Sequence, residues 1–122
     1  MAHVLPLIAI VDDDESVLKA LRRLLEACGF RTETFDSGRA FLDALRDHRP
    51  ACVLLDLHML GLTGWGVQAE MAAAGFSIPI IFITADGDPA VLERTMTTGA
   101  MFLLHKPFSE RRLLETIAAA IE

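Results

Sequence analysis

Carboxylate side chains gather at two points of this sequence where an apolar run ends. The stretch LIAIVDDDES, residues 7–16, passes from five apolar residues into a block of acids that begins with Asp12 and Asp13. A second run, CVLLD at residues 52–56, ends in Asp56. Neighbouring carboxylates repel one another, and their pKa values rise unless a cation lies near them. Because Mg²⁺ prefers oxygen ligands and usually takes one or two carboxylates with water, these aspartates are candidate metal ligands.

Part of the acidic block has a simpler explanation. Acids at the N-terminus of a helix are stabilised by the helix dipole, and this capping role accounts for Asp14 and Glu15. Capping does not account for Asp56, which follows four apolar residues and precedes another. We therefore assign only Asp14 and Glu15 to the start of a helix.

Two further polar residues lie at the ends of later apolar runs. Thr84 ends IPIIFIT at residues 78–84, and Lys106 follows MFLL at residues 101–104. A carboxylate nucleophile can form an aspartyl phosphate, and a metal ion and a lysine can neutralise the transferred group. We expect Asp56 to accept a phosphoryl group whose oxygens Thr84 and Lys106 hold. A change of the Thr84 rotamer would then signal that the group is present.

The apolar runs alternate with patterns that predict helices. Runs that are apolar throughout are typical of parallel strands buried on both faces, whereas RTETF alternates and predicts an edge strand. Strict alternation with short loops predicts an α/β fold, a parallel sheet with helices on both faces. Five strands favour the flavodoxin-like order 2-1-3-4-5, with sites at the carboxyl ends of strands 1 and 3. The strands are expected at residues 7–11, 32–35, 52–56, 78–84 and 101–104.

Capping residues and glycines mark the expected helices. The first helix ends at Gly29 after an apolar stripe made of Val17, Leu18, Leu21, Leu24, Leu25 and Cys28. The later helices are expected to begin near Ser37, after Gly64, at Asp88 followed by Pro89, and at Ser109. The third ends near Gly75 and the fourth at Gly99. The last is expected to face inward with Leu113, Leu114, Ile117, Ala118 and Ile121.

Composition excludes several classes of protein. The chain of 122 residues is 52% hydrophobic, yet it has no run of roughly 18 apolar residues, so we expect no membrane span and a cytoplasmic protein. The start of the chain also lacks the pattern of a signal peptide. The net charge of −6 argues against direct contact with nucleic acid. Cys28 and Cys52 have no metal or disulfide spacing, so both are interpreted as small buried hydrophobes.

With these residues in place, the chain resembles the receiver domain of two-component response regulators. The resemblance covers essentially all 122 residues and rests on VDDDE, LLDLHM, FITAD and KPF in this order. The amino-acid sequence is most similar to those of receivers of the nitrogen-fixation-regulator branch or of stand-alone receivers. It implies one domain, residues 1–122, that takes a phosphoryl group onto Asp56 from a sensor histidine kinase or a phosphotransfer protein. Such a domain switches conformation to control an output, and it catalyses only its own phosphorylation and dephosphorylation.

The resemblance also implies individual roles around Asp56. Asp13 would bind Mg²⁺ directly and Asp12 mainly through water, and the backbone carbonyl of His58 would be a further ligand. The peptide between Lys106 and the proline behind it would be cis.

Three positions depart from the family pattern. Leu60 stands where the family usually has proline, and Thr63 stands where it usually has an acid. Leu103, three residues before the lysine, replaces the aromatic switch residue, and the adjacent Phe102 would point to the opposite face of its strand. We therefore expect the switch to work differently here.

Several roles remain open at this stage. His58 and Asp86 either flank the path of the hydrolytic water and set the lifetime of the phosphorylated state, or are solvated loop residues. The protein itself is either a working phosphoacceptor or a receiver-like binding module that does not depend on phosphorylation. A haloacid-dehalogenase-type phosphatase would need Asp-x-Asp where Asp56-Leu57-His58 stands. A flavin-binding module would need a phosphate loop where the aspartates stand.

Surface residues suggest two kinds of partner. The helix after Asp88, the strand at residues 101–104 and the last helix form a face on which receivers often dimerise. Its charged residues are Glu93, Arg94, Glu110, Arg111, Arg112 and Glu115. The kinase contact is expected around Lys19, Arg22, Arg23 and Phe108. Trp65 is expected to pack near the site, and His3, His48 and His105 are interpreted as surface residues.

Overall fold

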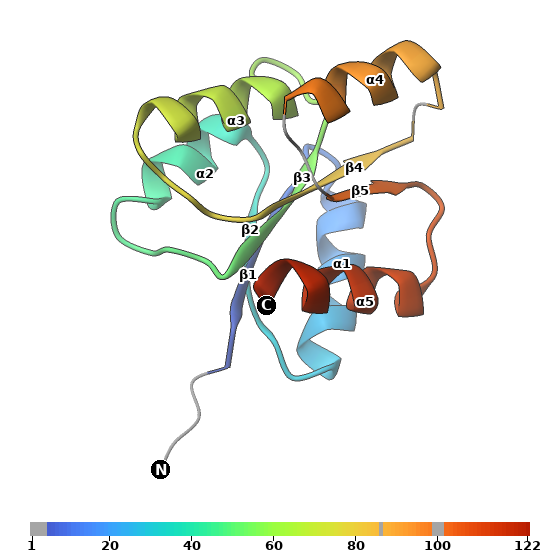
Figure 1. The fold of residues 1–122 in the computed structure, drawn as a ribbon. Helices are drawn as coiled ribbons and strands as arrows, with labels where there is room; N and C mark the ends of the chain where they lie inside the picture. Colours follow the sequence, from blue (N-terminus) through green and yellow to red (C-terminus); the bar gives the residue numbers. More distant parts are fainter. Residues whose placement is uncertain (1–4, 86, 99–101) are drawn as a thin grey trace.

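Strands and helices alternate along the chain in the computed structural model, which describes residues 5–85, 87–98 and 102–122 (Figure 1). The strands are β1 (Leu7–Val11), β2 (Arg31–Phe35), β3 (Cys52–Asp56), β4 (Ile80–Thr84) and β5 (Phe102–His105). The helices are α1 (Glu15–Ala27), α2 (Gly38–Ala44), α3 (Gly64–Ala73), α4 (Pro89–Thr97) and α5 (Glu110–Ile121). Among the described residues, no helix has the length and apolar character that a membrane crossing requires.

The five strands form one parallel sheet in the order β2-β1-β3-β4-β5, which confirms the predicted topology. β1 pairs with both β2 and β3, so the strand that ends before Asp12 lies beside the strand that ends in Asp56. RTETF is confirmed as an edge strand, because β2 pairs only with β1 in this order. The carboxyl ends of β1, β3, β4 and β5 therefore meet at one edge of the sheet.

Helices cover both faces of the sheet: α1 and α5 lie on one side, and α2, α3 and α4 lie on the other (Figure 1). Each face has its own core. Side chains such as Ile8, Leu25 and Ile117 fill the α1–α5 side, and Phe41, Val67 and Phe82 belong to the core on the opposite side. Every residue of β3 is buried, as the uninterrupted apolar run predicted.

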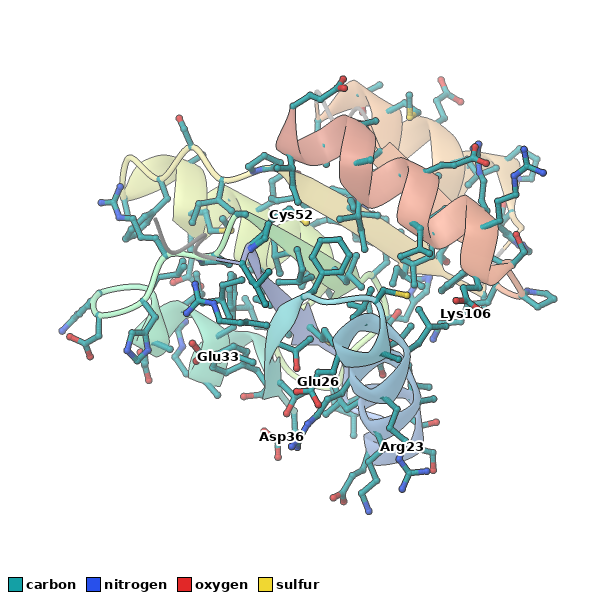
Figure 2. All side chains as sticks on the ribbon, turned by 90° about the horizontal axis from the view of Figure 1, so that it is seen from below. Arg23, Glu26, Glu33, Asp36, Cys52 and Lys106 are labelled. Carbon is teal, nitrogen blue, oxygen red and sulfur yellow. The ribbon has the colours of Figure 1, made fainter. Side chains whose placement is uncertain are left out.

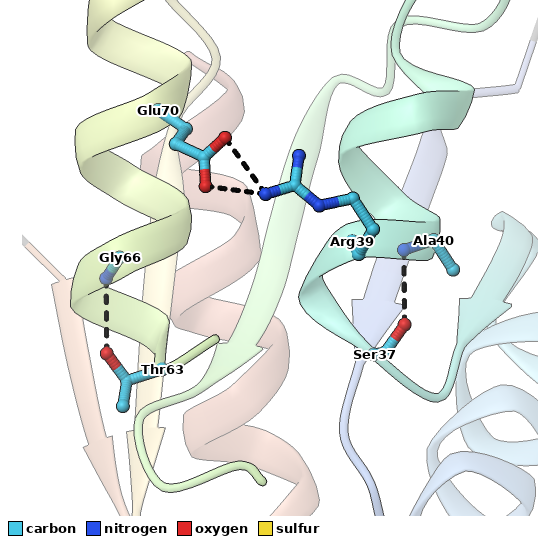
Figure 3. Close-up of polar contacts among 6 residues, drawn as sticks. All are labelled: Ser37, Arg39, Ala40, Thr63, Gly66 and Glu70. Atoms are coloured by element: carbon cyan, nitrogen blue, oxygen red, sulfur yellow. Dashed lines mark hydrogen bonds and ion pairs between the residues drawn. The ribbon is translucent and has the colours of Figure 1, made fainter. Parts of the chain in front are cut away.

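Polar caps fix where the helices begin. Asp14 accepts a hydrogen bond from the Ser16 backbone N–H at 2.9 Å and caps α1, which confirms its predicted role. The predicted caps Asp88 and Ser109 are confirmed as well, and α2 begins near Ser37 as expected, with Ser37 as its cap. Thr63 caps α3 by accepting from the Gly66 backbone N–H at 3.2 Å (Figure 3).

An ion pair joins the two neighbouring helices that Figure 3 shows. One guanidinium nitrogen of Arg39 on α2 donates to both carboxylate oxygens of Glu70 on α3, at 2.9 and 3.1 Å. Gly38 lies at this contact, since a Cβ added there would stand 2.5 Å from a methyl group of Val67. The start of α2 is thus packed tightly against α3.

Two predictions about the interior were wrong. Cys28 is exposed, because it is the C-cap residue of α1 and its Sγ lies 3.8 Å from Glu110 Oε1 at the surface. Ala118 is exposed too, whereas Thr116 and Ala120 are buried, because the buried side of α5 runs through other positions of the helical turn. Cys52 is buried as predicted (Figure 2), and burial raises the pKa of its thiol to about 12.

Element boundaries differ from the prediction by one or two residues. β2 begins at Arg31, and β4 begins only at Ile80, after Pro79, which has no N–H to donate to the sheet. β5 extends to His105. The predicted helix end at Gly99 and the predicted strand start at Met101 lie outside the described residues.

Two leucines that differ in burial test this core. Leu54 of β3 is fully buried, whereas Leu60 is 89% exposed in the loop after β3. Leu54→Ala should lower the free energy of unfolding by about 2–5 kcal/mol, because it removes buried methyl groups and leaves a cavity. Leu60→Ala should change it by less than about 0.5 kcal/mol. Urea unfolding of both variants measures the difference, and equal losses would contradict the assignment of the core.

Candidate functional site

Three carboxylates meet at the carboxyl edge of the sheet. Asp12 and Asp13 follow β1, and Asp56 is the last residue of the adjacent β3. One oxygen from each of the three lies within 4.8 Å of the others. The strand order brings them together, as predicted. Asp12 is 2% exposed and Asp56 is 8% exposed, so two of these acids lie away from bulk water.

A lysine from the opposite side of the cluster contacts the most buried acid. Lys106 Nζ lies 3.4 Å from Asp12 Oδ2, and the other oxygen of Asp12 accepts from the Asp14 backbone N–H at 2.9 Å. The lysine is positioned through its own peptide, because its backbone N–H donates to the carbonyl of Thr84 at 2.7 Å. The peptide between Lys106 and Pro107 is cis, as the resemblance implied.

The loop between β3 and α3 is tied to the other two carboxylates by its backbone. The His58 N–H donates to Asp56 Oδ1 at 3.3 Å, and the Leu60 N–H donates to Asp13 Oδ2 at 3.1 Å. The loop therefore lies directly over the acids, although Leu60 replaces the proline that the family usually has there. A change in the charge or position of either carboxylate would be transmitted to this loop.

The environment raises the pKa of Asp56 from 3.8 to about 6. Burial of the carboxyl is the largest cause, and the negative charge of Asp12 adds to it. Lys106 and the His58 N–H act in the opposite direction, and Asp13 raises the pKa further. A second cation beside the cluster would relieve this penalty. The donors are anionic oxygens from three residues, so the site fits a hard divalent cation such as Mg²⁺.

Three other predicted site residues, Thr84, Leu103 and His58, lie among the described residues. Thr84 is fully buried and ends β4. Leu103 is partly buried on the α2–α3–α4 side of the sheet, and Phe102 packs on the opposite side, as predicted. His58 is exposed and contributes its backbone to the site. Asp86 lies outside the described residues, so its tuning role stays a prediction.

Of the remaining histidines, His48 and His105 are described by the structure and do not belong to the carboxylate cluster. His48 is exposed, and its Nδ1 lies 3.5 Å from Glu33 Oε1. His105 is exposed at the end of β5. Both agree with the interpretation as surface residues, and His3 lies outside the described residues.

Two features of the site were missed by the sequence analysis. Gly64 begins α3 so close to the acceptor that an added Cβ would stand 2.7 Å from the Asp56 carbonyl oxygen. Trp65 is partly buried near the site, as expected, but its contacts with His58, Arg94 and Thr95 were not foreseen. The repeated glycines in GLTGWG were the available signal for the close approach, whereas the tryptophan contacts had none.

The raised pKa predicts how stability depends on pH without divalent cations. The pKa of Asp56, about 6 when folded, exceeds the ordinary value near 3.9, so its ionised form is disfavoured by folding. The free energy of unfolding of wild type should therefore fall as pH rises from about 4 to 7. Asp56→Asn should not show the part of this fall that comes from ionisation of Asp56. At pH 7 the variant should be more stable by about 3 kcal/mol, with no gain below pH 4.

Urea unfolding across this pH range measures the difference. Asp43→Asn, at an exposed position of α2, controls for removing one negative charge. A stability difference between wild type and Asp56→Asn that is the same at every pH would contradict the burial argument. Addition of Mg²⁺ should favour wild type, since the ion neutralises the cluster.

Comparison with known proteins places this site in a family. The model of the response regulator receiver domain matches residues 8–118. The response regulator protein TmoT of Ectopseudomonas mendocina is 39% identical over 115 residues, which cover 94% of this chain and 52% of that protein. The transcriptional regulatory protein FixJ of Bradyrhizobium diazoefficiens is 38% identical over 114 residues, which cover 93% of this chain and 56% of that protein. The chain thus spans about half the length of these relatives.

Two solved structures match this chain over nearly their whole length. A response regulator receiver protein from Burkholderia phymatum is 42% identical with a TM-score of 0.84, and the match covers 95% of this chain and 94% of that one. The structure of FixJ-N is 31% identical with a TM-score of 0.89 and coverage of 98% and 95%. The family match and these relatives show that the chain belongs to the receiver domain family of response regulators.

Proposed function

We propose that Asp56 of this receiver domain accepts a phosphoryl group from a sensor histidine kinase or a phosphotransfer protein and thereby switches an output or partner. The observation that carries the proposal is the cluster itself. Three carboxylates have oxygens within 4.8 Å of one another, and a lysine ammonium lies 3.4 Å from one of them. Such a concentration of negative charge is costly for a fold unless a cation binds there, and a cation beside a carboxylate nucleophile is what phosphoryl transfer uses.

In the proposed transfer, a carboxylate oxygen of Asp56 attacks the phosphorus of a phosphohistidine. The new O–P bond forms as the P–N bond breaks, and the imidazole leaves with the electron pair and then takes a proton. With a pKa of about 6, Asp56 is mostly ionised at neutral pH and so is ready to attack. Lys106 and the Thr84 hydroxyl hold the phosphoryl oxygens.

Asp12, Asp13, Asp56 and the carbonyl of His58 would hold Mg²⁺. When bound, the ion supplies positive charge to the phosphoryl oxygens during transfer. The direct role of Asp13 is supported by its exposure, because an exposed carboxylate can reach an ion that keeps several waters. Asp12 is already bound to Lys106 and to the Asp14 N–H, which supports its action through water.

The same proposal covers the rest of the domain. Residues 1–122 act as one unit in the cytoplasm, with no substrate beyond their own aspartyl phosphate. His58 and Asp86 tune the hydrolysis of this group. Contact with nucleic acid is left to other modules, because the net charge is −6.

A groove beside the acids supports the kinase contact. It has a volume of about 480 Å³ and is lined in part by Asp13, Lys19, Arg22 and Phe35. Lys19 and Arg22 pair with acids on their own helix at 3.8 and 3.4 Å. Arg23 is exposed and points outward from α1 (Figure 2), so it is open to a partner.

The face formed by α4, β5 and α5 is the proposed homodimer surface. Met96 is 54% exposed there, and a groove of about 450 Å³ lies between Phe102, Leu103 and Arg112. Arg111 already pairs with Glu115 at 2.8 Å. Isologous salt bridges between two copies would therefore compete with this pair.

A second candidate function is a binding module that does not depend on phosphorylation. Leu103 in place of an aromatic favours it, because the aromatic side chain that would follow a change at Thr84 is replaced by a smaller aliphatic one. The exposed Leu60 offers apolar surface beside the site. The carboxylate cluster and its lysine favour the phosphoacceptor.

Acetyl phosphate tests the acceptor directly. With Mg²⁺ present, wild type should gain one phosphoryl adduct, and Asp56→Asn should gain none because its amide is not a nucleophile. Asp14→Asn is the matched control, since Asp14 lies in the same acidic block but caps α1 instead of joining the cluster. Intact mass spectrometry measures the adduct. An adduct that persists on Asp56→Asn would move the acceptor elsewhere.

Mg²⁺ binding tests the proposed ligands separately. Trp65 lies beside His58, with ring centroids 5.9 Å apart, so its fluorescence should change as the ion binds. Asp13→Asn should weaken binding by about tenfold or more, since even the outer-shell partners of a metal site cost about 10–100-fold when they are mutated, and Asp14→Asn should not. Calorimetry provides an independent reading. Equal affinities in the two variants would remove Asp13 from the metal site.

A further inference from the structure

Trp65 lies between the loop that carries the acceptor and helix α4. It is the second residue of α3. Its ring meets the His58 ring edge-on at 5.9 Å between centroids. On its other side, the indole N–H donates to Thr95 Oγ1 at 3.0 Å, and the Arg94 guanidinium lies 3.9 Å from the ring centroid. One side chain thus contacts the neighbourhood of Asp56 and two residues of α4.

The contacts on the acceptor side are tight. The His58 N–H donates to Asp56 Oδ1 at 3.3 Å, so a new bond at this carboxylate changes the charge of the group that accepts this hydrogen bond. Gly64, next to Trp65, donates to the Leu57 carbonyl at 3.0 Å. A Cβ at Gly64 would meet the Asp56 carbonyl at 2.7 Å. The helix that carries Trp65 therefore begins against the acceptor peptide, with no gap to absorb a shift.

The contacts on the α4 side use a buried hydroxyl. Thr95 is fully buried and donates to the Val91 carbonyl at 2.8 Å while accepting from Trp65. Loss of the tryptophan bond would leave the partly buried indole N–H without this acceptor, which costs more than loss of an exposed hydrogen bond. Arg94 adds a cation–π contact to the same ring. Movement of Trp65 is thereby coupled to α4.

Leu103 lies on the same side of the sheet and has no such polar group. Trp65, Leu103 and Val91 all pack against the core on the α2–α3–α4 side. A leucine there can change rotamer, but it can neither donate a hydrogen bond nor stack on a guanidinium. Trp65 does both, and it does so from the α3 side instead of from β5.

We propose that Trp65 is the relay that couples the state of Asp56 to α4, through its hydrogen bond to Thr95 and its stack with Arg94. This inference rests on the proposed phosphoacceptor function. Two arrangements of the Trp65–Thr95 contact, favoured to different extents with and without a phosphoryl group on Asp56, are sufficient for such coupling.

Hydrogen exchange of the peptide that covers α4 tests the relay. It is measured with and without Mg²⁺ and beryllofluoride, a mimic of the phosphoryl group. Thr95→Val keeps the shape of the side chain and removes the acceptor. Trp65→Phe keeps an aromatic ring and removes the donor. Thr97→Val is the matched control, because Thr97 donates to the Arg94 carbonyl on the same helix and does not contact the indole nitrogen.

The relay predicts that beryllofluoride changes exchange in α4 of wild type and of Thr97→Val. Thr95→Val and Trp65→Phe should lose most of this change while still gaining the acetyl phosphate adduct on Asp56. A full α4 response in both relay variants would overturn the inference. A wild type that forms the adduct without any α4 response would also overturn it, and would leave the phosphoacceptor function standing. A wild type that neither forms the adduct nor binds beryllofluoride would overturn both.

Discussion

The repulsion between three carboxylates held at neighbouring strand ends is the constraint on which this structure depends. Asp12 and Asp56 are buried, and Asp13 completes a group whose oxygens lie within 4.8 Å of one another. A fold that only needed stability would not keep this arrangement, because burial raises the pKa of Asp56 to about 6. Lys106 relieves part of the repulsion. A divalent cation would relieve the remaining repulsion, which agrees with the proposed phosphoacceptor role.

The parallel sheet makes such a group of acids possible. The strands β1, β3, β4 and β5 end at one edge, and each brings one or two polar residues to it near the point where its apolar run stops. The backbone then does much of the positioning: N–H groups of His58 and Leu60 hold two of the acids, and the Thr84 carbonyl holds the peptide of Lys106. The same loop leads into α3, whose first residue, Gly64, lies against the acceptor peptide. A chemical change at Asp56 therefore takes place next to the start of α3.

The strand order and most of the site could be predicted from the sequence. Runs of apolar residues indicate buried strands, and the polar residues that follow them mark the strand ends. The order of strands and the meeting of Asp12 with Asp56 followed from those patterns and from the topology rules. Cys28 was wrongly predicted to be buried, because it continues the apolar stripe of α1 but is the C-cap residue of that helix and is exposed. The spacing of apolar residues does not show where the last helical turn ends. Ala118 was placed wrongly because alanine occurs on either side of a helix. The contact between Trp65 and Thr95 depends on side-chain packing between two helices, which no local pattern records.

The central claim is that Asp56, assisted by a divalent cation, is where the phosphoryl group binds. Fluorine NMR of beryllofluoride with this protein tests it most directly, because bound and free fluorides give separate resonances. The account predicts bound resonances for wild type only when Mg²⁺ is present, and none for Asp56→Asn at any Mg²⁺ concentration. Bound resonances that persist in Asp56→Asn, or that are missing from wild type with Mg²⁺, would contradict it.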